Sequence, residues 1–96
     1  MPAGRGIHRS MNDLTLRTIL YTHATCADSD KVRAWLSERG IAFTERDVTR
    51  DLNAAKALLA TGIFATPLLV VGDEQVLGFR PAEITRALVA GGIPVP

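Results

Sequence analysis

Two spacings of hydrophobic and polar residues along the chain indicate where strands and helices lie. The segment Leu14–Thr22 is rich in β-branched and apolar residues, which predicts a strand. Beyond Cys26 the apolar residues recur at helical spacing, at Val32, Trp35 and Leu36, which predicts a helix with one buried face. A glycine soon after Leu36 should end this helix, because glycine commonly follows the last helical residue.

The rest of the chain continues this alternation of strands and helices. Ala42–Val48 is predicted to be a second strand, and Asp51–Gly62, rich in alanine and leucine, a second helix. Pro67–Gly78 holds a continuous apolar run, a Gly-Asp turn and a short strand, which together predict a hairpin. Arg80–Gly91 is the last predicted helix, because Pro81 suits the first position of a helix.

The predicted elements follow the order β-α-β-α-β-β-α, which is typical of an α/β fold. The helix between the first two strands makes a βαβ unit, and such a crossover joins parallel strands. The hairpin then adds an antiparallel pair. We therefore expect a four-stranded mixed sheet with strand order 2-1-3-4, flanked by three helices.

Length and composition favour a single globular domain. The chain has 96 residues, 47% of them hydrophobic and 22% charged, which suits one core. We expect residues 1–12 to form a flexible N-terminal tail and residues 13–96 to form the domain, as a monomer. The 11 basic and 10 acidic residues nearly cancel, so no affinity for nucleic acid or for a membrane surface is expected.

The chain contains one cysteine, so it cannot form an intrachain disulfide. This argues against a secreted, disulfide-stabilised domain and for a reducing compartment, and we expect the protein to be cytoplasmic. Cys26 follows the first predicted strand and opens the first predicted helix, where free N–H groups and the positive helix end favour a thiolate. Many lone cysteines are instead buried and inert, so an unreactive Cys26 is the alternative.

The series of short motifs around this cysteine resembles the glutaredoxin family. The motif YTHATCADS is followed by ERDV, TP and GF, and the match extends from Leu14 to about Leu88. The resemblance implies a thioredoxin fold of the glutaredoxin type. It also implies that Cys26 is the nucleophile, that Pro67 is the family's cis-proline, and that Thr66 presents its backbone to a bound cysteinyl peptide.

The last motif, GFRP, is most similar to the glutaredoxin-like electron donors of ribonucleotide reductase. Its residues Gly78, Phe79 and Arg80 occupy the region where glutathione-using relatives hold the γ-glutamyl end of glutathione. The Gly-Gly and Asp that those relatives use are absent, and His23 stands where the family often has a lysine. The resemblance therefore implies substrate contacts from these four residues and weak binding of glutathione as a co-substrate. No tightly bound cofactor is expected.

Ser29 occupies the position where many family members have a second cysteine, so the motif is Cys-Ala-Asp-Ser. We therefore predict thiol–disulfide exchange by a monothiol mechanism, through Cys26 alone, on a small mixed disulfide or a disulfide-bearing protein. Ser29 should donate a hydrogen bond to the thiolate, and an external thiol should release the product. Asp28 and Asp30 should oppose the thiolate as like charges, and Arg33 should be solvated.

Three alternatives remain open. A redox-inert module could hold an extended peptide beside Pro67. A carrier could bind an iron–sulfur cluster between Cys26 of two chains and two external thiols. Glutaredoxin-like arsenate reductases also have a Cys-x-x-Ser loop, but they usually carry an arginine where this chain has Asp30. Within one chain, His8, His23 and Cys26 do not have the spacing of metal ligands, so no metal site is expected.

Overall fold

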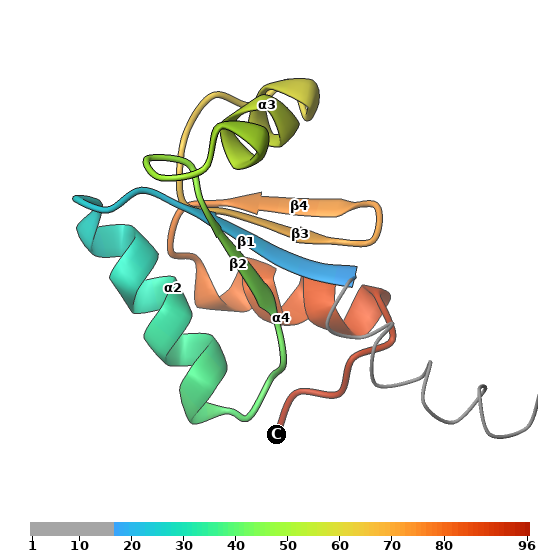
Figure 1. Cartoon of the computed structure of the whole chain (residues 1–96). Coiled ribbons are helices and arrows are strands. Elements are labelled where there is room, and N and C mark those ends of the chain that lie inside the picture. The colour runs from blue at the N-terminus through green and yellow to red at the C-terminus, as the bar shows by residue number, and fades with distance from the viewer. Residues whose placement is uncertain (1–16) are drawn as a thin grey trace, which may run out of the picture.

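The computed structural model describes residues 17–96, so the predicted tail of residues 1–12 lies outside the described residues. Four strands form one mixed sheet in the order β2-β1-β3-β4 (Figure 1). The strands are β1 (Thr18–Thr22), β2 (Thr44–Asp47), β3 (Leu68–Val71) and β4 (Glu74–Leu77). β1 runs parallel to β2 and antiparallel to β3, and β3 is antiparallel to β4. The predicted topology is thus confirmed.

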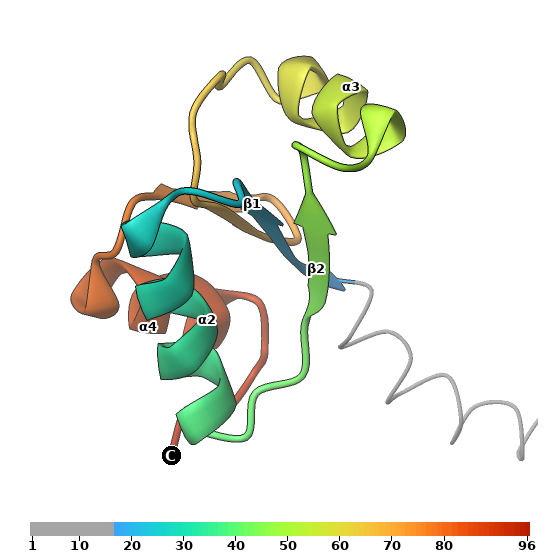
Figure 2. The ribbon, with the colours of Figure 1, turned by 60° about the vertical axis from the view of Figure 1, so that its left-hand side comes forward.

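Three helices of the described chain cover the two faces of the sheet: α2 (Ala27–Glu38), α3 (Leu52–Ala60) and α4 (Pro81–Ala90). α2 and α4 lie together on one face, and α3 lies on the other (Figure 1; Figure 2). The alternation of side chains along β1 explains this arrangement. Leu20 packs with residues of α2 and α4, whereas its neighbour Tyr21 packs with α3. None of these helices is long and apolar enough to cross a membrane.

Two hydrophobic clusters fill the space between the layers. The larger one, between the sheet and helices α2 and α4, consists of Leu20, Val32, Leu36, Ile41, Leu69, Val71, Val76, Ile84, Ala87, Leu88 and Ile93. The smaller one, beneath α3, consists of Tyr21, Leu58 and Leu68. Trp35, which the sequence pattern placed on the buried stripe, is only partly buried, and the guanidinium of Arg39 lies 4.0 Å from its ring centroid. The inner stripe of α2 therefore fixes this helix against the sheet.

The second strand is shorter than its sequence pattern predicts. The prediction began at Ala42, but β2 begins at Thr44. The N–H of Ile41 donates to the carbonyl oxygen of Leu36 at 3.0 Å, which closes the turn after α2, and Ile41 is buried in the core. Ile41 therefore belongs to the end of α2, and the chain enters the strand only at Thr44. β1 likewise begins at Thr18, and residues 14–16 of its predicted range lie outside the described residues.

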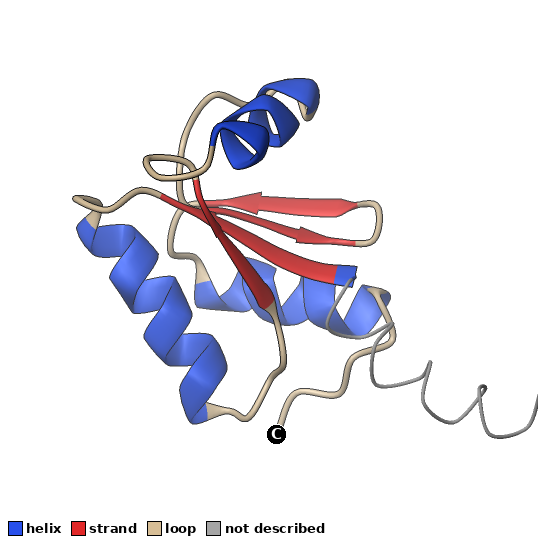
Figure 3. Ribbon diagram, viewed as in Figure 1, coloured by secondary structure: helices blue, strands red, loops and turns tan. Residues whose placement is uncertain are grey.

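The sheet brings two loops together at one of its ends. Because β1 and β3 are antiparallel, the carboxyl end of β1 lies beside the amino end of β3, with Tyr21 paired to Leu68. The loop into α2 and the loop before β3 therefore meet at this end, on the left in Figure 3. The peptide bond between Thr66 and Pro67, in the second of these loops, is cis.

Candidate active site

Cys26 is the N-cap residue that directly precedes α2, after the turn that follows β1. Its N–H donates to the carbonyl oxygen of His23 at 3.1 Å, and its carbonyl oxygen accepts from the N–H of Ser29 at 3.1 Å. Its backbone is extended, and within the described chain its side chain makes no capping hydrogen bond. The sulfur can therefore face the free N–H groups of the helix start, and the residue is partly exposed.

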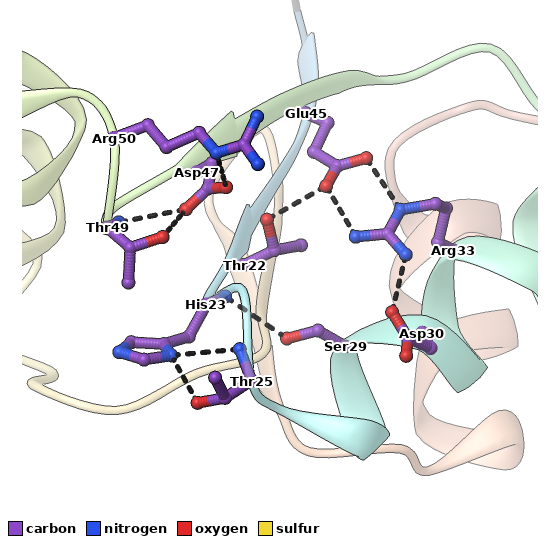
Figure 4. Close-up of polar contacts among 10 residues, drawn as sticks. All are labelled: Thr22, His23, Thr25, Ser29, Asp30, Arg33, Glu45, Asp47, Thr49 and Arg50. Atoms are coloured by element: carbon purple, nitrogen blue, oxygen red, sulfur yellow. Dashed lines mark hydrogen bonds and ion pairs between the residues drawn. The ribbon is translucent and has the colours of Figure 1, made fainter.

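Ser29 lies in the first turn of α2 and is fully buried. Its hydroxyl oxygen accepts a hydrogen bond from the backbone N–H of His23 at 3.4 Å (Figure 4). A hydroxyl has one proton to donate as well as lone pairs to accept. Because the Ser29 oxygen accepts the N–H of His23, the hydroxyl proton of Ser29 is free to be donated to the sulfur of Cys26.

The surroundings of Cys26 make its thiol more acidic than usual. The hydrogen bond from the Ser29 hydroxyl does most to lower the pKa of Cys26, and the backbone N–H groups of Ser29 and Asp28 add to it. Partial burial raises this pKa but does not offset the donors. The side chain of Thr66 makes the smallest lowering contribution, whereas its carbonyl oxygen, 3.8 Å from the sulfur, can only accept. These are the features of a reactive thiol.

The acids beside Cys26 are engaged with cations on the same helix. Asp28 lies 3.7 Å from the ammonium of Lys31, and Asp30 lies 2.7 Å from the guanidinium of Arg33. Each carboxylate is paired with a cation and exposed to solvent. The two negative charges therefore destabilise the Cys26 thiolate less than the sequence predicted. The prediction that Arg33 is merely solvated is wrong, because Arg33 also binds Glu45 at 2.6 Å.

The ring of His23 is bonded to its own loop. Its Nδ1 accepts the N–H of Thr25 at 3.3 Å and lies 3.1 Å from the hydroxyl of Thr25. The ring points away from the hydroxyl of Ser29 in Figure 4, while the backbone N–H of His23 points toward it. His23 is exposed, so its ring is accessible from solvent at the edge of the loop.

Thr66 lies opposite Cys26, with its carbonyl oxygen 3.8 Å from the sulfur, and Pro67 follows it through the cis peptide bond. Pro67 is buried, and its carbonyl oxygen accepts the N–H of Gly78 at 2.8 Å. Gly78 has φ of 87°, a conformation that residues with a side chain rarely adopt. Gly78 therefore holds the backbone of Pro67 in place from the neighbouring strand.

The next two residues of the GFRP motif lie between β4 and α4. Phe79 is partly buried against the larger hydrophobic cluster. Arg80 is exposed and lines a depression of about 480 Å³ between β4 and α4. Among the described residues that line this depression, Cys26 does not occur.

Replacing Ser29 with alanine should move the alkylation of Cys26 to higher pH. The variant loses the strongest donor to the thiolate, so the pKa of Cys26 rises and less thiolate is present at neutral pH. The measurement is the rate of iodoacetamide uptake at Cys26 as a function of pH. Asp28→Asn is the matched control in the same turn, and its midpoint should stay near that of the wild type because Asp28 pairs with Lys31. An unchanged midpoint in Ser29→Ala would mean that the hydroxyl does not reach the thiolate.

Similarity to known proteins identifies the family of this chain. The family model described as Glutaredoxin matches residues 18–76. The glutaredoxin-like protein NrdH of Escherichia coli K12 is 34% identical over 71 residues, which are 74% of this chain and 88% of that protein. The chain belongs to the glutaredoxin family. Glutaredoxins are thiol–disulfide oxidoreductases, and the position of Cys26 at a helix start suits that chemistry.

A second relative and a solved structure also match this chain. The glutaredoxin-like protein NrdH of Lactococcus lactis MG1363 is 30% identical over 67 residues, which are 70% of this chain and 93% of that protein. The solved structure of the NrdH-redoxin from Escherichia coli, a glutaredoxin-like protein described as having a thioredoxin-like activity profile, matches with a TM-score of 0.68. It is 32% identical and covers 84% of this chain and 100% of that chain.

The polar contacts behind Ser29 in this glutaredoxin were not predicted from the sequence. Thr22 is buried and donates to Oε2 of Glu45 at 2.9 Å, and Arg33 joins Glu45 to α2 (Figure 4). A signal for them does exist. Leu20 is a core residue on the α2 face of the sheet, and the alternation of side chains puts Thr22 on the same face. A buried hydroxyl at that position requires an acceptor nearby.

Proposed function

We propose that this protein reduces mixed disulfides by a monothiol mechanism, with Cys26 as the nucleophile and external thiols as the resolving partners. The observation that carries the proposal is the set of donors around the sulfur. The Ser29 hydroxyl and the N–H groups of α2 lower the pKa of Cys26, which is of use to a nucleophile and not to a structural cysteine. Because Ser29 occupies the position of a second cysteine, the chain has no internal thiol with which to complete a disulfide.

The reaction has two steps. In the first, the thiolate of Cys26 attacks the small-thiol sulfur of a mixed disulfide between a small thiol and a protein. A disulfide forms between Cys26 and the small thiol, the original disulfide breaks, and the protein leaves as a thiolate that takes up a proton. In the second, the thiolate of another small thiol attacks this adduct. The product is a disulfide of the two small thiols, and the thiolate of Cys26 is restored.

The substrate is proposed to approach Cys26 past Thr66 and Pro67. The carbonyl oxygen of Thr66 lies 3.8 Å from the sulfur, so a disulfide that reaches the exposed side of Cys26 runs beside this loop. An extended peptide can pair with such a backbone as an added strand would. The absence of the Gly-Gly and Asp with which glutathione-using relatives hold the γ-glutamyl end favours weak glutathione binding. A peptide or protein disulfide is therefore the proposed substrate, and glutathione the proposed resolving thiol.

This cycle consumes reduced thiols. A protein that depends on an external thiol after every attack needs a compartment where thiols are kept reduced. A reducing compartment such as the cytoplasm is therefore the proposed location.

A turnover assay tests the proposed function. The substrate is a peptide–glutathione mixed disulfide, and the resolving thiol is glutathione in one series and dithiothreitol in another. We expect the rate of peptide release to rise in proportion to protein concentration in both series. Rates that equal those of the thiols alone in both series would refute thiol-transfer catalysis. Acceleration with dithiothreitol only would show that glutathione is not the resolving thiol.

A further inference from the structure

Glu45 lies where three elements meet behind the cysteine. From β2, its Oε2 accepts the hydroxyl of Thr22, on β1, at 2.9 Å. Both of its oxygens accept from Arg33 on α2, with Nε to Oε1 at 2.8 Å and Nη2 to Oε2 at 2.6 Å. Figure 4 shows the continuous chain of contacts from Thr22 through Glu45 to Arg33 and Asp30. Two parallel bonds between a guanidinium and a carboxylate form a strong contact with a defined geometry.

The charge and burial of these groups keep the contact in place. Hydrogen bonds from Arg33 and Thr22 lower the pKa of Glu45, and the nearby Asp47, on the same strand, opposes them less strongly. Glu45 therefore remains ionised around neutral pH. The hydroxyl of Thr22 belongs to a residue that is 1% exposed, so its bond to Glu45 satisfies a group that water does not reach.

Each of the two partners of Glu45 is connected to the Ser29 hydroxyl, one through β1 and the other through α2. Thr22 ends β1, and its neighbour His23 supplies the N–H that donates to this hydroxyl at 3.4 Å. Arg33 lies one helical turn after Ser29 on α2, so it holds the helix that carries the hydroxyl. Glu45 thus ties the end of β1 to the first turns of α2.

We propose that Glu45 is a positioning residue for the thiol chemistry: by binding Thr22 and Arg33 together, it keeps the hydroxyl of Ser29 directed at the sulfur of Cys26. Glu45 contacts Thr22 and Arg33, so its effect on Cys26 passes through Thr22, the backbone of the next residue and Ser29. The inference rests on the proposed function for its biological role. The direction of the hydroxyl, however, alters the acidity of the thiol whether or not the protein turns over a disulfide.

The other groups around Cys26 are held by contacts of their own. The first charged residue of α2 is Asp28, which pairs with a lysine. The preceding loop contributes His23, whose ring is bonded within that loop, and the loop across contributes the uncharged Thr66. Asp28 contacts Lys31, the His23 ring contacts Thr25, and the carbonyl oxygen of Thr66 contacts the sulfur, so each is held independently of Glu45. A change in the titration of Cys26 on substitution of Glu45 therefore reports on the contacts described above.

The Glu45→Gln variant tests the inference by the direction in which it shifts the pH of half-maximal Cys26 alkylation. Loss of a negative charge alone makes a thiolate easier to form and lowers the pH of half-maximal Cys26 alkylation. Loss of positioning weakens the donation from Ser29 and raises that pH. We expect the midpoint to rise in Glu45→Gln, and to rise also in Thr22→Val, which keeps every charge. Glu83→Gln is the matched control, because it breaks another Arg–Glu pair of 2.6 Å on α4, and its midpoint should match the wild type.

The same two substitutions in a Ser29→Ala background show whether the effect passes through Ser29. We expect no further shift there, because the hydroxyl that Glu45 positions is gone. Thermal unfolding of each variant confirms that it is folded. Midpoints that fail to rise in both Glu45→Gln and Thr22→Val, or that shift equally in the Ser29→Ala background, would overturn the inference. Failure of the proposed function has a different signature: the wild type does not turn over the mixed disulfide, while the alkylation midpoints still shift.

Discussion

The Cys26→Ser variant is expected to transfer no thiol at all. The chain has one cysteine, and a serine hydroxyl neither ionises near neutral pH nor forms a disulfide. The rate at which a peptide–glutathione mixed disulfide is reduced should therefore fall to the rate of the external thiol alone. The measurement compares wild type and variant at equal concentration, with the same thiol in both.

The variant should remain folded, which makes the loss of activity interpretable. Cys26 is only partly buried, and serine is among the residues that best precede a helix. Its thermal unfolding temperature should be at least that of the wild type. A folded Cys26→Ser protein that still accelerates the reduction would mean that the chemistry does not run through this thiol.

The Ser29→Cys variant is expected to change the mechanism from monothiol to dithiol. Ser29 lies three residues after Cys26, in the first turn of α2, and its hydroxyl lowers the pKa of Cys26, so we expect a sulfur at position 29 to come within bonding reach. After attack on a mixed disulfide, the new thiol should displace the small thiol from Cys26 before an external thiol arrives. An intramolecular attack has a high effective concentration, which gives it this advantage.

Intact mass separates the two mechanisms. In the absence of free thiol, the wild type should carry the small thiol as an adduct. Ser29→Cys should instead lose it and become lighter than the reduced variant by the hydrogens of the two thiols. Ser29 is fully buried, so the melting temperature of the reduced variant checks that the larger atom fits. A folded variant that keeps the adduct would show that the side chain at position 29 does not face Cys26.

The fold follows from the sequence to a large degree because its elements carry strong local signals. Val32 and Leu36 recur at helical spacing, and both are buried against the sheet. The continuous apolar run after Pro67 predicts β3, a strand buried in the middle of the sheet. The βαβ unit and the hairpin together leave few ways to arrange four strands, so the strand order was predictable as well.

The candidate site was only partly predictable, because long-range contacts decide what each polar residue does. Cys26 and Ser29 belong to one helix turn, so their proximity follows from sequence spacing. The contact between Arg33 and Glu45 joins residues that are 12 positions apart and depends on how α2 crosses β2. Arg80 follows a strand whose end lies near the cysteine, yet its side chain lines the depression beside α4. Local sequence patterns do not determine which neighbours such polar side chains reach.

The mass of the protein after a single turnover is the most direct test of the proposal that Cys26 acts alone as the nucleophile. The protein is mixed with an equal amount of a glutathionylated peptide, above the alkylation midpoint of Cys26 and without free thiol. The predicted result is a protein that has gained one glutathionyl group, located by proteolysis on the fragment that contains Cys26, together with release of the reduced peptide in equal amount. A protein of unchanged mass beside an intact glutathionylated peptide would contradict the account.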